Sequence, residues 1–230
     1  MKKDLSKFEQ KNKLYFKNKD ILKSIFIHRS YLNEHTDIKI DHNERLEFLG
    51  DAVLELIVTD YLYRNFNNPE GELTNWRSAL VKGQMLSNLA SEIEIDDYLY
   101  LSHGEQKSTG KARQIILANA FEALIGGIYL DRGYDEAKKF VFKHLIIKLP
   151  DIIKNKTYLD AKSNLQELSQ EKFSITPSYI LIEESGPDHN KVFEIGVLIG
   201  EKQLGVGRGS SKQEAEQAAA KSAIEKIDQL

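Results

Sequence analysis

The chain has 230 residues, of which 41% are hydrophobic and 29% charged, as is typical of globular proteins of one or two domains. It contains no cysteine, which excludes disulfides and thiolate metal sites and favours an intracellular compartment. The formal net charge of −3 gives no simple electrostatic case for nucleic-acid binding. Such binding would have to depend on local patches or on bound metal ions.

The start of the chain is charged and lacks the apolar segment of a signal peptide. No apolar run elsewhere approaches the length that spans a bilayer. We therefore expect a cytoplasmic protein with no membrane partner.

In the first part of the chain the apolar residues recur at the spacing of amphipathic helices. The turn composition at residues 67–71 interrupts this pattern. We predict helices around residues 22–26, 44–63, 73–89, 116–130 and 135–149, with a loop at 101–110. This part, residues 1–152, is expected to be all-helical.

Residues 153–158 are polar and aperiodic, which predicts a linker, and the pattern changes beyond them. Leu165 and Leu168 mark a helix, residues 179–183 resemble a strand, and residues 193–199 alternate in the two-residue period of a half-buried strand. Residues 186–190 would form the hairpin loop between the strands. Ser210 or Ser211 can cap a last helix, in which three alanines would face a sheet: Ala215, Ala219 and Ala223. Residues 159–230 are therefore expected to form a small α+β domain.

The two parts differ in charge. Residues 158–230 hold 8 Lys and Arg against 12 Asp and Glu, whereas the preceding residues hold 24 and 23. Because the small domain is the more acidic one, any nucleic-acid contact there must be local and geometric.

The most informative segment is residues 41–56, where Glu44, Glu47 and Asp51 follow the spacing i, i+3 and i+7. This spacing places the three carboxylates on one helix face, and apolar residues occupy much of the rest of the circumference. Like charges beside apolar surface are unfavourable unless a cation neutralises them, and a hard divalent metal prefers carboxylate oxygens. Alternatively, the acids form a solvated edge that the helix dipole favours. Spacing alone leaves both interpretations open.

Residues 43–51, together with 28–30 and 122–126, closely resemble the signature motifs of bacterial ribonuclease III. Four later segments resemble the double-stranded RNA-binding domain of the same family: residues 165–167, 186–189, 205–207 and 211–219. The resemblance covers nearly the whole chain in the expected order. It implies a multidomain α and α+β fold, with an all-helical endonuclease domain followed by an α-β-β-β-α domain.

The resemblance implies a Mg²⁺-dependent endoribonuclease that hydrolyses double-stranded RNA to 5′-phosphate and 3′-hydroxyl ends. Its expected roles are the processing of ribosomal RNA precursors and messenger RNA. Mn²⁺ is a plausible substitute for Mg²⁺, and no organic cofactor is expected. The implied active form is a homodimer, in which Phe48 matches the aromatic residue that the family inserts into its partner subunit.

Glu47, Asp51 and Glu122 match the positions that hold catalytic metal in this family. The resemblance also implies that the acidic sites of the dimer lie in one RNA-binding valley. Glu44 matches a catalytic acid of this valley that supports substrate or metal-bound water, and Glu70 resembles another acid of the valley. We therefore expect Glu44, Asp51 and Glu122 to be catalytic.

One metal position departs from the family pattern, which commonly has aspartate where this chain has Asn119. An amide oxygen can coordinate a hard cation but carries no charge, so we expect weaker metal affinity. The alternative is a double-stranded RNA-binding protein whose catalysis is weakened or lost because of Asn119. A third interpretation, a helical scaffold with a protein-binding domain, leaves the acidic helix face unexplained.

For RNA recognition, Gln166, Glu167 and His189 match minor-groove contacts, and Lys212 matches a phosphate contact at a helix N-terminus. The family often has a second basic residue where this chain has Gln213, which favours weak, salt-sensitive binding by the small domain alone. His28 and His103 are expected to be structural or loop residues. Four basic residues of the first domain are candidates for RNA-backbone contacts or are solvated charges: Arg77, Lys82, Lys107 and Arg113.

Overall fold

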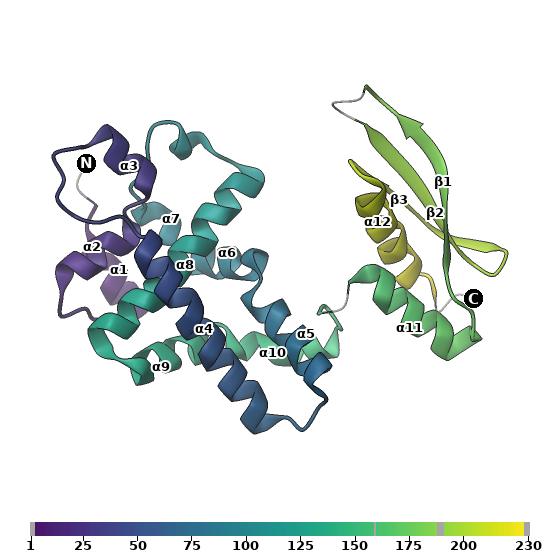
Figure 1. Cartoon of the computed structure of the whole chain (residues 1–230), viewed down its shortest axis with the longest axis horizontal. Helices are drawn as coiled ribbons and strands as arrows, with labels where there is room; N and C mark the ends of the chain where they lie inside the picture. The colour runs from purple at the N-terminus through teal and green to yellow at the C-terminus, as the bar shows by residue number, and fades with distance from the viewer. Residues whose placement is uncertain (1–2, 159, 188–190, 228–230) are drawn as a thin grey trace. The chain divides into compact units, whose positions relative to one another are not determined.

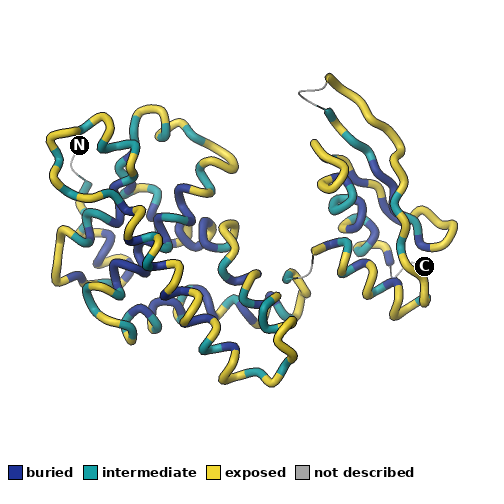
Figure 2. The backbone as a smooth tube through the Cα atoms, in the orientation of Figure 1, coloured by how far each residue is buried: buried dark blue, intermediate teal, exposed yellow. Residues whose placement is uncertain are grey.

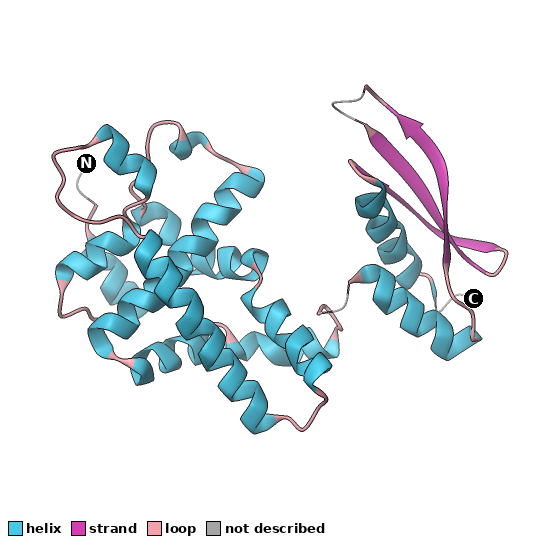
Figure 3. Ribbon diagram, in the orientation of Figure 1, coloured by secondary structure: helices cyan, strands magenta, loops and turns pink. Residues whose placement is uncertain are grey.

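The computed structural model of the protein describes residues 3–158, 160–187 and 191–227. The chain forms two compact units, Met1–Asn155 and Lys156–Leu230. Figure 3 shows that the first unit is helical and that the second combines three strands with two helices. None of the helices in the described ranges has both the length and the apolar character needed to cross a bilayer.

The helices of the first unit include three that the sequence predicts well, at residues 22–26, 44–63 and 116–130. In chain order they are α1 (Leu5–Asn12), α2 (Lys19–Phe26), α3 (Arg29–Glu34), α4 (Glu44–Asn65), α5 (Glu70–Val81), α6 (Gly83–Glu92), α7 (Ile95–Tyr98), α8 (Gly110–Arg132), α9 (Tyr134–His144) and α10 (Leu149–Lys154). Two short 3-10 helices accompany them, η1 (Glu105–Lys107) and η2 (Ile146–Lys148).

The single helix predicted over residues 73–89 is wrong, because the chain turns at Lys82 between α5 and α6. The Lys82 backbone is extended, with φ −64° and ψ 142°, and its carbonyl then accepts the first hydrogen bond of α6, from Met85 N–H. Both helices bury apolar residues, so the hydrophobic period continues across the break. The last helix also differs: α9 ends at His144, and α10 includes residues 153 and 154, which the sequence assigned to the linker.

Helix α8 runs through the core of the first unit (Figure 2). Phe121, Leu124 and Ile125 in its middle are fully buried, and α8 packs against α2, α4, α6 and α9. Buried residues therefore occupy most of the circumference of this helix.

Helices α4 and α8 cross at two glycines, Gly50 and Gly126 (Figure 1). A Cβ atom at Gly50 would stand 2.6 Å from the Glu122 carbonyl carbon, and one at Gly126 would stand 3.0 Å from the Gly50 nitrogen. Only glycine permits so close an approach of two backbones. The crossing sets the part of α4 that carries Glu47 and Asp51 beside the part of α8 that carries Glu122.

The first turn of α4 is pinned by Asn43, which is buried. Its backbone N–H donates to the Ile27 carbonyl at 2.9 Å, and its side-chain amide donates to the Ile25 carbonyl at 3.3 Å. These bonds fix the start of the helix, where Glu44 and Glu47 lie.

The second unit has the order α11 (Ala161–Phe173), β1 (Ser178–Ser185), β2 (Val192–Ile199), β3 (Lys202–Gly209) and α12 (Lys212–Ile224). The strands form an antiparallel sheet in the order β1-β2-β3. Figure 1 shows both helices on the same side of this sheet. The predicted α-β-β-β-α domain is thus confirmed, and so is the alternation along β2, where Ile195, Val197 and Ile199 are buried.

Helix α12 packs directly on strand β3, because every second residue of the strand is glycine: Gly205, Gly207 and Gly209. A Cβ atom at Gly207 would stand 2.5 Å from the Ala215 carbonyl oxygen. Ala215, Ala219 and Ala223 are fully buried, as the sequence predicts for a small-residue face toward the sheet. Ser211 caps the helix by accepting a hydrogen bond from Glu214 N–H at 3.2 Å.

Candidate active site and RNA-binding surface

Three carboxylates influence one another at the crossing of α4 and α8. Glu47 and Glu122 are half-buried, whereas Asp51 is exposed. Burial raises the pKa of Glu122 to about 7, and the charges of Asp51 and Glu47 add to this effect. Burial also raises the pKa of Glu47, and the negative charges of Glu44 and Asp51 raise it further. A hydrogen bond from the Asn119 side chain lowers the pKa of Glu47.

Within the described residues, none of Glu47, Asp51 and Glu122 forms an ion pair with Lys, Arg or His. Among the described residues, the side-chain partner that offsets the repulsion at Glu47 is the neutral amide of Asn119. The described parts of the chain contain no three His, Cys, Asp or Glu side chains close enough to hold a metal ion by themselves. The site therefore offers hard oxygen donors with excess negative charge, a combination that attracts a divalent cation together with its own water ligands.

Two further acids from the sequence analysis differ in their relation to this cluster: Glu44 acts on Glu47, whereas Glu70 lies apart. Glu44, at the start of α4, has its Oε1 3.8 Å from Arg29 Nη1 and its Oε2 3.7 Å from His42 Nδ1. Glu70 begins α5, beyond the other end of α4, and accepts a hydrogen bond from Thr74 Oγ1 at 2.9 Å. Within one chain, the structure does not bring Glu70 to the carboxylate cluster.

On the second unit, Gln166 and Glu167 are exposed on α11, where they help to line a shallow polar hollow. Lys212 is the first residue of α12, and its Nζ lies 5.9 Å from the centre of the Phe193 ring. His189, the fourth predicted RNA contact, lies outside the described residues.

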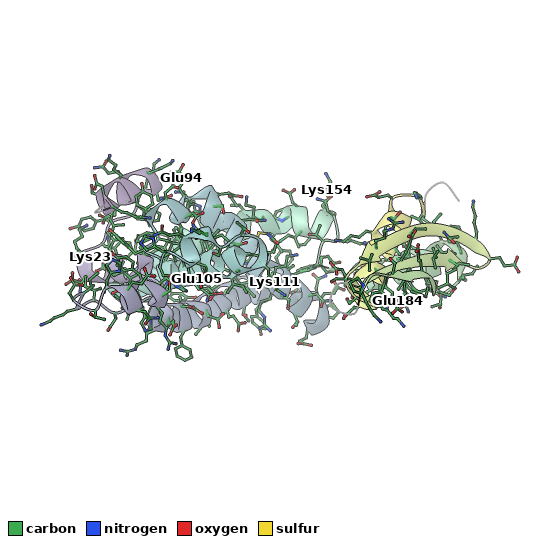
Figure 4. All side chains as sticks on the ribbon, turned by 90° about the horizontal axis from the view of Figure 1, so that it is seen from above. Lys23, Glu94, Glu105, Lys111, Lys154 and Glu184 are labelled. Atoms are coloured by element: carbon green, nitrogen blue, oxygen red, sulfur yellow. The ribbon has the colours of Figure 1, made fainter. Side chains whose placement is uncertain are left out.

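The four candidate basic residues of the first unit differ in how far they are engaged. Arg113 pairs with Asp96 and donates to the Glu105 carbonyl. Arg77 donates to Thr59 Oγ1 at 3.2 Å. Two are exposed, Lys82 and Lys107, and so is Lys111 in the first turn of α8, which the sequence analysis did not single out (Figure 4).

The two histidines expected to be structural or loop residues have local roles. His28 caps α3, because its Nδ1 accepts a hydrogen bond from Ser30 N–H at 3.3 Å. His103 is exposed, and its backbone N–H donates to the Glu34 carboxylate at 3.2 Å. Neither contacts the carboxylate cluster in these interactions.

The motifs do not predict how the site is assembled. Gly50 and Gly126 let the two helices touch, and the hydrogen bonds of Asn43 hold the start of α4 in place. The available signal was a glycine inside each helical pattern, which often marks a close approach of backbones.

Two family models match the chain: Ribonuclease-III-like over residues 18–149 and Double-stranded RNA binding motif over residues 161–227. The chain is 46% identical to Ribonuclease 3 of Oceanobacillus iheyensis over 226 residues, which cover 98% of this chain and 99% of that protein. It is 44% identical to Ribonuclease 3 of Borreliella burgdorferi, over 100% of this chain and 94% of that protein. Among solved structures, the nuclease domain of ribonuclease III from Campylobacter jejuni matches with 36% identity and a TM-score of 0.57, over 64% of this chain and 99% of that chain.

The helical unit with its carboxylate cluster, followed by a double-stranded RNA-binding domain, defines a nuclease directed at duplex RNA. The chain belongs to the ribonuclease III family, as its sequence motifs indicate. It is a double-stranded RNA-specific endoribonuclease, a hydrolase.

Proposed function

We propose that this protein hydrolyses phosphodiester bonds of double-stranded RNA in a Mg²⁺-dependent reaction, leaving 5′-phosphate and 3′-hydroxyl ends. Its proposed setting is the cytoplasm, where it would process ribosomal RNA precursors and messenger RNA. The observation that carries the proposal is the uncompensated carboxylate cluster at the crossing of α4 and α8. Its chemistry fits Mg²⁺, with Mn²⁺ as a plausible substitute.

Four side chains would hold the ion, directly or through its water ligands: Glu47, Asp51 and Glu122 with carboxylate oxygens, and Asn119 with its amide oxygen. When bound there, the ion would supply a water-derived nucleophile near neutral pH, by favouring loss of a proton from water, and would stabilise the negative charge of the transition state. Glu122 must be deprotonated to contribute, which its pKa of about 7 permits near neutral pH. Exposed Glu44 is proposed to orient substrate or water beside this group, with Arg29 holding its carboxylate.

The proposal is tested with purified protein and a long RNA hairpin, incubated with Mg²⁺ or with EDTA. We expect cutting only with Mg²⁺, and products that carry 5′-phosphate and 3′-hydroxyl ends. Binding of the hairpin without any Mg²⁺-dependent cutting would support the alternative of a non-catalytic RNA-binding protein and contradict the enzyme assignment of the site.

Replacing Asn119 with aspartate should lower the Mg²⁺ concentration needed for half-maximal cleavage. The substitution adds a fourth carboxylate to the cluster, and each added charge strengthens the attraction for a divalent cation. A Mg²⁺ titration of the cleavage rate measures the effect, which we expect to be on the order of tenfold. An unchanged Mg²⁺ requirement would remove Asn119 from the metal site.

We also propose that the active form is a homodimer built on helix α4. Phe48, Leu56 and Tyr63 are 82%, 58% and 79% exposed, and together with exposed Ala52 they form an apolar stripe along one helix face. Such a face suits a self-complementary contact about a two-fold axis. The nuclease domain of the Campylobacter jejuni protein has a structurally flexible region that is involved in dimer formation.

An antiparallel pairing centred near Leu56 would bring Phe48 of one chain to the Tyr63 end of the other α4. At that end, between α4 and α5, lies a hollow of about 390 Å³ with Thr59, Leu62 and Leu73 in its lining. The same pairing would bring Glu70 toward the start of the second α4, where Glu44 lies. This arrangement gives Glu70 a place in the proposed RNA-binding valley.

Replacing Phe48 with alanine should shift the solution mass toward monomer, because the most exposed apolar side chain of the stripe is lost. Light scattering over a concentration series measures the shift. The matched control is Ile147→Ala, which removes a side chain of η2 that is 62% exposed and lies outside the stripe. A dimer unaffected by Phe48→Ala would reject the anchor role of Phe48.

A further inference from the structure

Helix α11 carries the proposed RNA contacts Gln166 and Glu167. It packs on the rest of the second unit chiefly through α12. Its apolar anchor is small: Ala161 and Leu165 are buried, and Leu168 and Phe173 are partly buried. Polar contacts must therefore contribute to how α11 sits on α12.

At the first turn of α11, the side-chain amide of Gln217 on α12 makes two hydrogen bonds. Gln217 Oε1 accepts from Ala161 N–H at 2.9 Å, and Gln217 Nε2 donates to Asp160 Oδ1 at 3.1 Å. Asp160 is also the N-cap of α11 and accepts from Ser163 N–H at 3.0 Å. One side chain of α12 thus holds both the first N–H of α11 and its capping carboxylate.

Charged and polar neighbours support this contact. Lys162 Nζ lies 2.6 Å from Glu216 Oε2, again between α11 and α12. The hydrogen bonds from Ser163 and Gln217 lower the pKa of Asp160 to about 2, so its carboxylate stays ionised at any physiological pH. Near the other end of α11, Ser169 Oγ donates to the Ile175 carbonyl at 2.6 Å, which ties the following loop to the helix.

The exposed face of α11 between these two ends includes Ser163, Gln166 and Glu167. Lys212 stands at the N-terminus of the other helix, α12. A domain that recognises duplex RNA by its shape needs its separate contacts at a spacing that matches the grooves. The docking of α11 on α12 sets that spacing here.

We propose that Gln217 is a positioning residue for duplex RNA. By holding Asp160 and Ala161, it fixes the first turn of α11 on α12 and thereby sets the spacing between Gln166 and Lys212. The inference rests on the proposed binding of duplex RNA through these two helices.

The test uses the full chain with the substitution Gln217→Leu, which keeps the approximate volume of the side chain but removes both hydrogen bonds. Affinity for an RNA hairpin is measured in EDTA at 25 °C, with circular dichroism as a check on folding. We expect binding to weaken about tenfold while the protein stays folded. With Mg²⁺ present, KM should rise by a similar factor and kcat should stay unchanged.

If Gln217 only stabilised the fold, Gln217→Leu would bind RNA with wild-type affinity at 25 °C, because the protein would still be folded far below its melting temperature. Val197→Ala is the matched control, since it removes buried volume from β2 without touching the contacts of Gln217. It should lower the melting temperature and leave RNA affinity unchanged.

Gln217→Glu is a second variant, because it keeps an acceptor for Ala161 N–H but sets a second carboxylate against Asp160. It should also weaken RNA binding. Wild-type affinity in Gln217→Leu would overturn the positioning role, whereas failure of the wild type to bind duplex RNA would overturn the proposed function instead.

Discussion

Replacing Glu122 with glutamine should reduce RNA cleavage by roughly a thousandfold or more while duplex RNA binding is retained. The substitution removes one of three carboxylates at the crossing of α4 and α8 and keeps the volume of the side chain. A metal site contributes several kcal/mol to transition-state stabilisation, and each 1.36 kcal/mol corresponds to about tenfold in rate. Single-turnover cleavage of a hairpin with Mg²⁺ and a binding assay in EDTA measure the two properties separately.

The same substitution has a pH-dependent effect on stability. The folded-state pKa of Glu122, about 7, lies above the usual value of 4.5, so the folded protein holds this proton more tightly than the unfolded chain does. Without metal, Glu122 therefore destabilises the fold as pH rises from 4.5 through 7. We expect Glu122→Gln to be more stable than the wild type by about 1 kcal/mol at pH 8, after allowance for solvent screening, and equally stable at pH 4.

The control is Glu72→Gln, which changes an exposed acid of α5. The Glu72 carboxylate accepts a hydrogen bond from the Asn68 side chain, and a glutamine at position 72 can still accept it. It should alter neither cleavage nor the pH dependence of unfolding. If Glu122→Gln lost cleavage, RNA binding and helical structure together, Glu122 would have a folding role and not a catalytic one.

Replacing Gly50 with alanine should destabilise the first unit by about 3 kcal/mol or more and abolish cleavage. The new methyl group would overlap the backbone of Glu122 and stand 2.9 Å from the Gly126 nitrogen. Backbone atoms cannot move aside as a flexible side chain can, so α4 and α8 must separate. That separation also pulls Glu47 and Asp51 away from Glu122.

Gly71→Ala is the matched control, because a Cβ atom at this helical position would meet nothing within 4 Å. Alanine is the better helix former, so this variant should unfold at the same denaturant concentration as the wild type or at a slightly higher one. Urea unfolding of the three proteins tests both expectations. Equal stability of Gly50→Ala and Gly71→Ala would contradict the tight helix crossing.

Much of this architecture could be predicted because local patterns decide it. The helical period of α8, the alternation along β2 and the serine cap of α12 each lie within the element that they predict. The break at Lys82 was missed, because apolar residues keep a helical period on both sides of it while one residue adopts an extended backbone. Local sequence carried no strong signal there, since Gly83 alone does not specify a break.

The site itself depended on contacts between residues distant in the sequence. The spacing of Glu44, Glu47 and Asp51 predicts one acidic helix face, and the charges of Glu44 and Asp51 do raise the pKa of Glu47. The spacing does not show that Glu47 and Asp51 also act on Glu122 of α8, or that Glu44 lies near Arg29 and His42. Which helix approaches α4, and how closely, follows from Gly50 meeting α8. No periodicity of a single helix contains that information.

The alternative of a non-catalytic RNA-binding protein rests on Asn119, which replaces a carboxylate of the family pattern. The charge that remains in the carboxylate cluster tests this alternative. The hydrogen bond from Asn119 partly offsets the repulsion at Glu47, but Glu122 still has its pKa raised to about 7 by burial and by Asp51 and Glu47. Excess negative charge therefore remains at the site despite the missing carboxylate. This residual charge favours metal binding and hence the enzyme.

The most direct test of the site is calorimetric titration of the metal-free protein with Mg²⁺, in buffers of different ionisation enthalpy at pH 6 and pH 8. Because Glu122 has a pKa of about 7, metal binding should release close to one proton per site at pH 6 and almost none at pH 8. Glu122→Gln should abolish this difference. Mg²⁺ binding without proton release at pH 6, or with the same proton release in Glu122→Gln, would contradict a metal site at the crossing of α4 and α8.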